Sequence, residues 1–115
     1  MKIINANREL EKETIYRLTK EMGRAQVSKS AGMTVKVADW VQYQDDPLRE
    51  GDEAREALSF IDSETGEVFT TISPTFIRTF FEIVDIGIES PTIDIETGTT
   101  NKGREFYFAK LHYSK

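Results

Sequence analysis

The clearest pattern of apolar and polar positions along the chain lies between Gly66 and Ile86. A short alternating stretch is followed there by apolar residues three and four positions apart: Ile77, Phe80, Phe81 and Val84. This spacing places them on one face of a helix. Ser73 offers an oxygen to the free N–H groups of a first helical turn, and Pro74 suits the first helical position. The pattern predicts a helix over residues 74–86.

Alternation of apolar and polar residues on both sides of this helix predicts five strands. They comprise residues 34–43, 57–62, 67–73, 92–100 and 104–113. Gly66 supplies the positive-φ position that the short connection between the second and third strands requires, so these two are predicted to form a hairpin. Asn101–Gly103 predicts a turn between the last two strands.

The alternation also predicts which side chains face inward. In the first strand the inward set is Val35, Val37, Val41 and Tyr43, and the outward set is Lys36, Ala38, Trp40 and Gln42. Asp39 interrupts the inward set and therefore predicts a bulge at that point. In the last strand the inward set is Tyr107, Ala109, Leu111 and Tyr113, which leaves Phe106, Phe108, Lys110 and His112 outward.

The N-terminal segment predicts one more helix, from about Arg8 to Met22, with Asn5 or Asn7 as its N-cap. A small, polar and basic loop follows it. We expect residues 1–33 to pack on the same domain as residues 34–115, so that the chain forms a single domain.

The predicted order is three strands, a helix and two strands, preceded by an N-terminal helix. This is the order of the OB-fold, a partly open five-stranded Greek-key barrel. We therefore predict a mainly β protein with an OB-fold-like barrel over residues 34–115, in which the helix at 74–86 plugs the open end. An α+β sandwich with helices on one face is the alternative.

Charge is distributed unevenly along the 115 residues, whose net charge is −5. Residues 17–36 carry five cations and one acid, a net of +4, whereas residues 37–67 carry two cations and ten acids, a net of −8. A chain this asymmetric can present a basic surface despite its total charge, because screening beyond about 10 Å makes local charge dominant. Two solvated faces of opposite sign are the alternative interpretation.

Several classes of protein are disfavoured by the residues present. No apolar run approaches the ~20 residues of a membrane helix, and the N-terminus does not have the pattern of a signal peptide. The absence of cysteine fits a reducing, cytoplasmic location. His112 is the only histidine, and no glycine-rich phosphate loop or EF-hand spacing occurs. We therefore expect no catalytic residue, no metal site, no cofactor and no enzymatic activity.

Aromatic and basic residues on the predicted outward faces favour binding of single-stranded nucleic acid, which uses aromatic platforms for bases and cations for phosphates. The candidate residues are Lys36, Trp40, Phe69, Lys102, Arg104, Phe106, Phe108 and Lys110. Phe69 belongs to this set if Val68 and Thr70 face the core. The alternative role of these aromatic residues is to close the barrel or to pack under the N-terminal helix.

Two stretches, GEVFTTISPTFIRTFFEIV and ETGTTNKGREFYFAKL, resemble the single-stranded DNA-binding proteins of small tailed phages that infect Gram-positive bacteria. In that family a Ser-Pro-Thr-like cap leads from a strand into a helix, and a Lys-x-Gly-Arg-x-Phe turn opens the final strand. The resemblance covers residues 34–113. It implies a role in phage DNA replication within the host cytoplasm, without catalysis or cofactor, and it implies DNA contacts by Lys102, Arg104 and Phe106.

The acidic loop at residues 44–56 departs from the family pattern, because it would repel phosphate if it lay beside the DNA. Our first hypothesis is sequence-tolerant single-stranded DNA binding, with replication proteins as further partners and no membrane association. The rival hypothesis is a protein–protein interaction module, such as a phage inhibitor whose acidic loop mimics nucleic acid.

Overall fold

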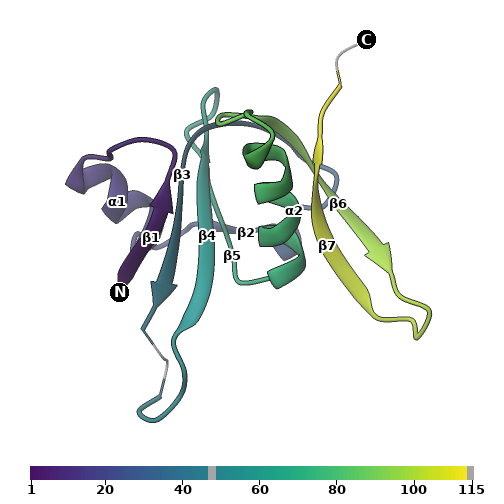
Figure 1. Cartoon of the computed structure of the whole chain (residues 1–115), viewed down its shortest axis with the longest axis horizontal. Helices are drawn as coiled ribbons and strands as arrows, with labels where there is room; N and C mark the ends of the chain where they lie inside the picture. The colour runs from purple at the N-terminus through teal and green to yellow at the C-terminus, as the bar shows by residue number, and fades with distance from the viewer. Residues whose placement is uncertain (47–48, 114–115) are drawn as a thin grey trace.

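The computed structural model describes residues 1–46 and 49–113. They form a mainly β protein with two α-helices, in which a curled mixed sheet makes a half-barrel (Figure 1). The elements are β1 (Lys2–Ala6), α1 (Lys12–Thr19), β2 (Ala25–Gln26), a 3-10 turn (Val27–Lys29), β3 (Thr34–Asp45), β4 (Arg55–Asp62), β5 (Val68–Thr71), α2 (Pro74–Asp85), β6 (Thr92–Thr99) and β7 (Glu105–Leu111).

The long strand β3 is the centre of the sheet, whose order is β2-β5-β4-β3-β6-β7. One edge of β3 pairs with β4, and the other edge pairs first with β6 and then with β1. All pairs are antiparallel except β2 with β5. In the described residues β5 does not pair with β7, and α2 lies in the side of the half-barrel that is left open (Figure 1).

Helix α2 begins as predicted. Ser73 is its N-cap, with an Oγ that accepts a hydrogen bond from the N–H of Phe76 at 3.2 Å, and Pro74 is the first helical residue. The buried face of α2 consists of Phe76, Ile77, Phe80 and Ile83. The rings of Phe76 and Phe80 stack on Phe60 of β4 at centroid distances of 5.9 and 5.7 Å. The aromatic core therefore lies between α2 and the concave face of the sheet.

A bulge in β3 lies where Asp39 predicts it, because the pairing register with β4 shifts between Val37 and Trp40. The extra residue reverses the phase of the alternation. As a result Trp40 joins Val35 and Val37 in the main core, is 2% exposed and donates its indole N–H to the carbonyl of Glu89 at 2.8 Å. The prediction that Trp40 faces outward is therefore wrong.

Beyond the bulge, β3 contributes to a second core on the opposite face of the sheet. Its buried members are Leu18, Val41, Tyr43, Ala57 and Val68. Leu18 comes from α1, so this helix covers the outer face of β3, β4 and β5. The Tyr43 hydroxyl lies 3.2 Å from both Ser59 Oγ and the Arg24 guanidinium, so that the polar atoms of this layer are hydrogen-bonded.

The N-terminal segment differs from the prediction. The first residues form the strand β1, and α1 begins at Lys12 rather than Arg8. Neither asparagine caps this helix, whose N-cap residue Glu11 makes no side-chain cap bond. The Asn7 side chain instead forms hydrogen bonds with the backbone of the bulge in β3. Its amide donates to the carbonyl of Ala38 at 2.9 Å, and its oxygen accepts from the N–H of Trp40 at 3.1 Å.

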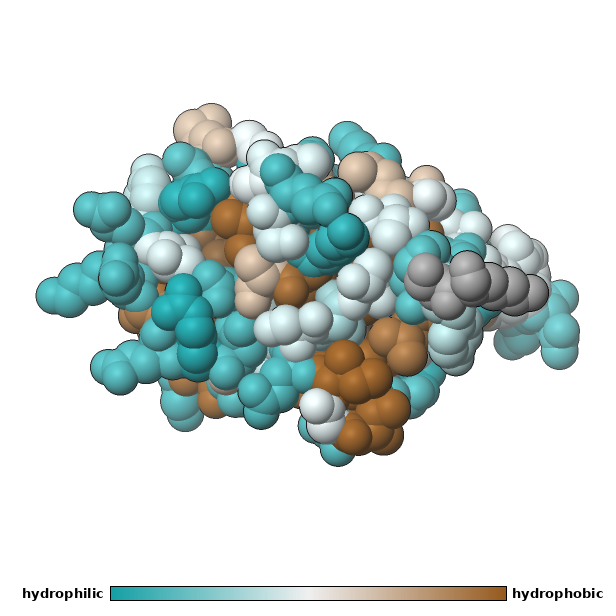
Figure 2. All heavy atoms as spheres, turned by 90° about the horizontal axis from the view of Figure 1, so that it is seen from above, coloured by the Kyte–Doolittle hydropathy of each residue, from teal (hydrophilic) through white to brown (hydrophobic). Residues whose placement is uncertain are grey.

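Figure 2 shows the molecule from above, relative to Figure 1. The surface on this side is mostly hydrophilic, with apolar side chains gathered toward one edge. Met22 and Ile86 are the most exposed of the large hydrophobic residues, at 95% and 75%. In the part of the chain that the structure describes, no helix has the length and apolar character needed to cross a membrane.

Candidate nucleic-acid interface

The outer face of the β6–β7 hairpin brings several of the predicted residues together. The pairs across this face are Phe106 with Gly98, Phe108 with Glu96, and Lys110 with Asp94. Arg104 precedes β7 on the same face, because its carbonyl accepts from the N–H of Thr100 and so continues the ladder. The opposite face belongs to the core, where Ile93 and Ile95 are 0% exposed and Ala109 is 6% exposed. The predicted inward and outward sets of β7 are therefore confirmed up to Leu111, whereas Tyr113 is exposed.

Phe106 and Phe108 form the aromatic part of this face. Both are half-buried, and their ring centroids lie 5.9 Å apart with a tilt of 37° between the planes. The Phe106 ring lies over Gly98, where a Cβ atom would be only 2.3 Å from its Cζ. The two rings thus give the hairpin a continuous apolar surface on its outer side.

Cations flank the aromatic pair. Lys102 and Arg104 are exposed at the β6–β7 turn, and Lys110 is exposed on the other side of the rings. Within residues 1–46 and 49–113, no carboxylate forms an ion pair with any of these three. The predicted turn is confirmed, with Gly103 at φ +80° and its N–H donating to the carbonyl of Thr100 at 2.9 Å. These cations are therefore accessible to an anionic ligand.

Lys36 lies on the same face but far from the turn. It pairs with Thr92 at one end of β6, roughly 23 Å along the strand from Thr99 at the other end. Its ammonium donates to Glu64 at 2.5 Å, and this hydrogen bond, followed by the charge of Glu64, raises the pKa of Lys36 above its usual value. A phosphate at Lys36 would have to compete with that carboxylate.

Trp40 and Phe69, which were predicted to lie on outward faces, are both in the main core. Phe69 is 1% exposed and stacks on Phe60 at a centroid distance of 5.4 Å. Its neighbour Val68 points into the second core, so β5 is covered on both faces and has no outward aromatic position. Neither ring can reach a base without leaving the core, and the prediction of their orientation is corrected accordingly.

Asp94 and Glu96 place negative charge on the same face. Thr34 donates its hydroxyl to Asp94 at 2.6 Å, and His112 Nδ1 lies 3.0 and 3.1 Å from its two oxygens. The Thr34 hydrogen bond is the main reason why the pKa of Asp94 is below its usual value, and the bond to His112 adds to it. The Thr34 hydroxyl is directed to Asp94 and not to the imidazole, so this trio is no activated nucleophile.

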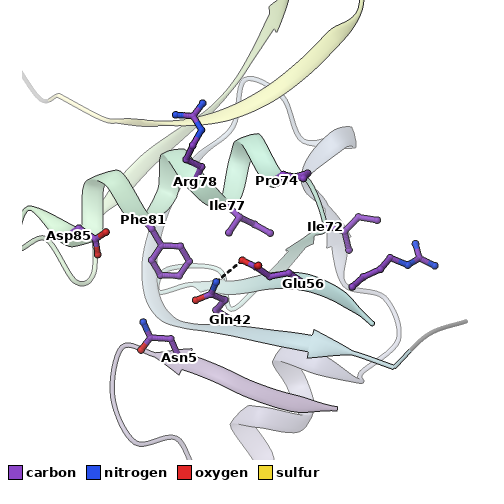
Figure 3. A pocket seen from close by; sticks show the side chains of 10 residues that line it. Asn5, Gln42, Glu56, Ile72, Pro74, Ile77, Arg78, Phe81 and Asp85 are labelled. Atoms are coloured by element: carbon purple, nitrogen blue, oxygen red, sulfur yellow. Dashed lines mark hydrogen bonds between the residues drawn. The ribbon is translucent and has the colours of Figure 1, made fainter. Parts of the chain in front are cut away.

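A hollow of about 670 Å³ lies beside α2, and the sequence pattern does not predict it. Figure 3 shows Ile77 and Phe81 of α2 pointing toward Gln42 and Glu56 on the sheet, while Arg78 points away. Gln42 donates to Glu56 at 2.6 Å. The hollow is lined partly by β1, a strand that alternation did not reveal. Residues of both charges line it, so it has no evident preference for an ion.

The chain has no match among protein-family models, curated proteins or solved structures. In the described residues, no three acidic or histidine side chains gather in a way that could hold a metal ion. The paired aromatic rings and the exposed cations beside them make the outer face of the β6–β7 hairpin the candidate site.

Proposed function

We propose that this protein binds single-stranded DNA with little sequence preference, through the outer face of the β6–β7 hairpin, and that it does so in phage DNA replication. The observation that carries the proposal is the pair of Phe106 and Phe108, side by side on an outer strand face between the exposed cations Arg104 and Lys110. Bases stack on aromatic rings regardless of their identity, and cations bind the phosphates between them.

The distribution of charge supports this assignment despite the net charge of −5. The acidic loop at residues 44–56 lies between β3 and β4, and in Figure 1 the described part of this connection is at the lower left while the β6–β7 turn is at the lower right. Two acidic residues of this loop also form ion pairs within the protein: Asp45 with Lys20 at 3.6 Å, and Asp46 with the N-terminal amine at 2.6 Å. Repulsion between this segment and DNA at the hairpin is therefore weakened by distance and screening.

The strand order supports an OB-fold as the finer description of the half-barrel. Strands β3, β4 and β5 are consecutive, and β6 returns after α2 to lie beside β3, which is the Greek-key order. In OB-folds the face of the second and third strands commonly takes part in ligand binding. Here α1 covers the outer face of the equivalent strands, β4 and β5, through Leu18. The free outer surface of the sheet is therefore the β6–β7 hairpin.

The test is a titration of fluorescently labelled oligo-dT followed by anisotropy at low and moderate salt. Replacing both Phe106 and Phe108 with alanine should weaken binding by about 5- to 150-fold for each base that loses its platform, because stacking contributes about 1–3 kcal/mol per base. Tyr16→Ala is the matched control, since Tyr16 is an exposed aromatic residue on α1. Unchanged binding by the double variant would exclude this face.

The protein–protein interaction module is the competing function, and the same titration separates the two. A module that uses the acidic segment as a nucleic-acid mimic would not bind oligo-dT even at low salt. Asp45 and Asp46 make ion pairs but their side chains stay 42% and 72% exposed, so the preference for DNA binding rests on the aromatic rings and free cations of the hairpin. Absence of oligo-dT binding by a folded protein would reverse this preference.

A further inference from the structure

Gly98 is an exception among the glycines of this chain. Six glycines adopt a positive φ, which side chains other than glycine disfavour, but Gly98 does not. It lies inside β6, where a glycine weakens a strand because it has no side chain to pack. The backbone therefore gives no reason for glycine at this position, and the reason must lie in what occupies the space above it.

The ring of Phe106 occupies that space. A Cβ atom on Gly98 would lie 2.3 Å from Cζ of Phe106 and 2.8 and 2.9 Å from its two Cε atoms. Cζ is the nearest atom and the two Cε atoms follow at almost equal distances, so the tip of the ring lies over the position that a Cβ atom of Gly98 would take. The tip of the Phe106 ring thus covers the bare backbone of Gly98, and the side chain stays half-buried.

We propose that Gly98 and Phe106 form a subsite for one unpaired nucleobase, with Gly98 as the residue that positions the ring. This inference rests on the proposed function and deepens it. A side chain at position 98 would push the ring out of the place it now occupies across β6. The absence of a side chain there is what lets the ring extend over the strand and hold one position for a base to stack on.

The neighbouring ring limits how a base can bind. A base inserted between two aromatic rings requires them to be about 7 Å apart, twice the ~3.5 Å contact distance of carbon atoms. The centroids of Phe106 and Phe108 are 5.9 Å apart and the planes are tilted by 37°. A base therefore stacks on the outer face of Phe106 and is not intercalated between the two rings. Arg104, two residues before Phe106, is placed to contact the adjoining phosphate.

Gly98→Ala is the direct test, because its methyl group would lie in the space of the ring and force Phe106 to move. Binding of labelled oligo-dT should weaken by about 5- to 150-fold, as for Phe106→Ala. A variant that combines Gly98→Ala with Phe106→Ala should bind oligo-dT no more weakly than Phe106→Ala alone, because both changes remove the same interaction. Thr99→Val, which replaces a hydroxyl with a methyl group on the opposite face of β6, is the control and should bind as the unmodified protein does.

A second measurement reports on the ring without DNA. One α-proton of Gly98 points to the place of the missing Cβ, under the tip of the Phe106 ring, so its NMR signal should be shifted upfield and should return toward its ordinary position in Phe106→Leu. If the unmodified protein binds oligo-dT and Gly98→Ala binds equally well, the subsite is wrong and the proposed function stands. If the unmodified protein does not bind oligo-dT, both are wrong. An absent upfield shift would likewise overturn the positioning role of Gly98.

Discussion

The hydroxyl of Thr79 joins α2 to the unpaired edge of β7, and its removal should destabilise the protein measurably. Its Oγ1 accepts a hydrogen bond from the N–H of Ala109 at 2.8 Å and lies 3.0 Å from the carbonyls of Thr75 and Phe76, to one of which it donates. Ala109 is 6% exposed, and its N–H points away from β6. No other partner is present for this buried amide in the described residues.

Thr79→Val keeps the shape of the side chain and removes the hydroxyl, both as the acceptor for Ala109 and as a donor to a helix carbonyl that already lies within α2. The amide of Ala109 then stays buried without a partner, which costs about 1–3 kcal/mol of the free energy of unfolding. Thr79→Ser retains the acceptor and loses one methyl group, so it should cost about 0.8 kcal/mol or less. The valine variant should therefore be the less stable of the two, although valine is the more hydrophobic residue.

Urea denaturation followed by Trp40 fluorescence measures both variants. Trp40 is the only tryptophan, is 2% exposed and contacts Phe80 edge to face at 5.9 Å, so its emission reports on the core beside α2. The midpoint should fall in Thr79→Val with little change in slope. A valine variant as stable as the unmodified protein, or a serine variant that loses as much as valine, would refute this role of the hydroxyl.

Three further predictions concern charge and buried polar groups. Replacing Lys102 and Arg104 with alanine should weaken oligo-dT binding for all sequences and reduce the slope of log K against log salt by up to about 1.4, and an unchanged slope would remove the turn from the site. Thr34→Val should raise the pKa of Asp94. A carboxyl pKa that is lowered in the folded state stabilises the fold above about pH 4. In urea denaturation the variant should therefore show its full loss of stability above that pH, and the loss should disappear as the pH falls through the native pKa of Asp94. Tyr43→Phe should cost about 0.5–1.5 kcal/mol in the same assay, because its hydroxyl is hydrogen-bonded in the second core, and no loss would show that water replaces it.

Local signals made part of the fold and of the candidate site predictable. The cap at Ser73 and the spacing of apolar residues after Pro74 depend only on neighbours in sequence, and the helix begins where they indicate. The outward positions of Phe106, Phe108 and Lys110 follow from simple alternation in a strand that has one face in the core and one outside. The pairing of Phe106 with Gly98 depends on the turn, which the sequence also marks.

The orientations of Trp40 and Phe69 could not be predicted in the same way. Alternation identifies an outer face only where one face of a strand is free, and α1 covers β3 and β5 on the side away from the main core. The bulge reverses the phase of the alternation, so Trp40 lies on the same side of β3 as Val37, although simple alternation would place them on opposite sides. Asn7 illustrates the same difficulty, because its partners in β3 are 31 and 33 residues away.

The alternation of β7 has a consequence for how this protein can change over generations. Positions that serve the core, such as Ala109, and positions on the outer face, such as Phe108 and Lys110, differ by a single step along the strand yet contact different surroundings. The end of the hairpin near Phe106 extends away from the half-barrel (Figure 1). Substitutions on the outer face can therefore accumulate under selection for a new ligand, while the inner positions remain under selection for folding alone.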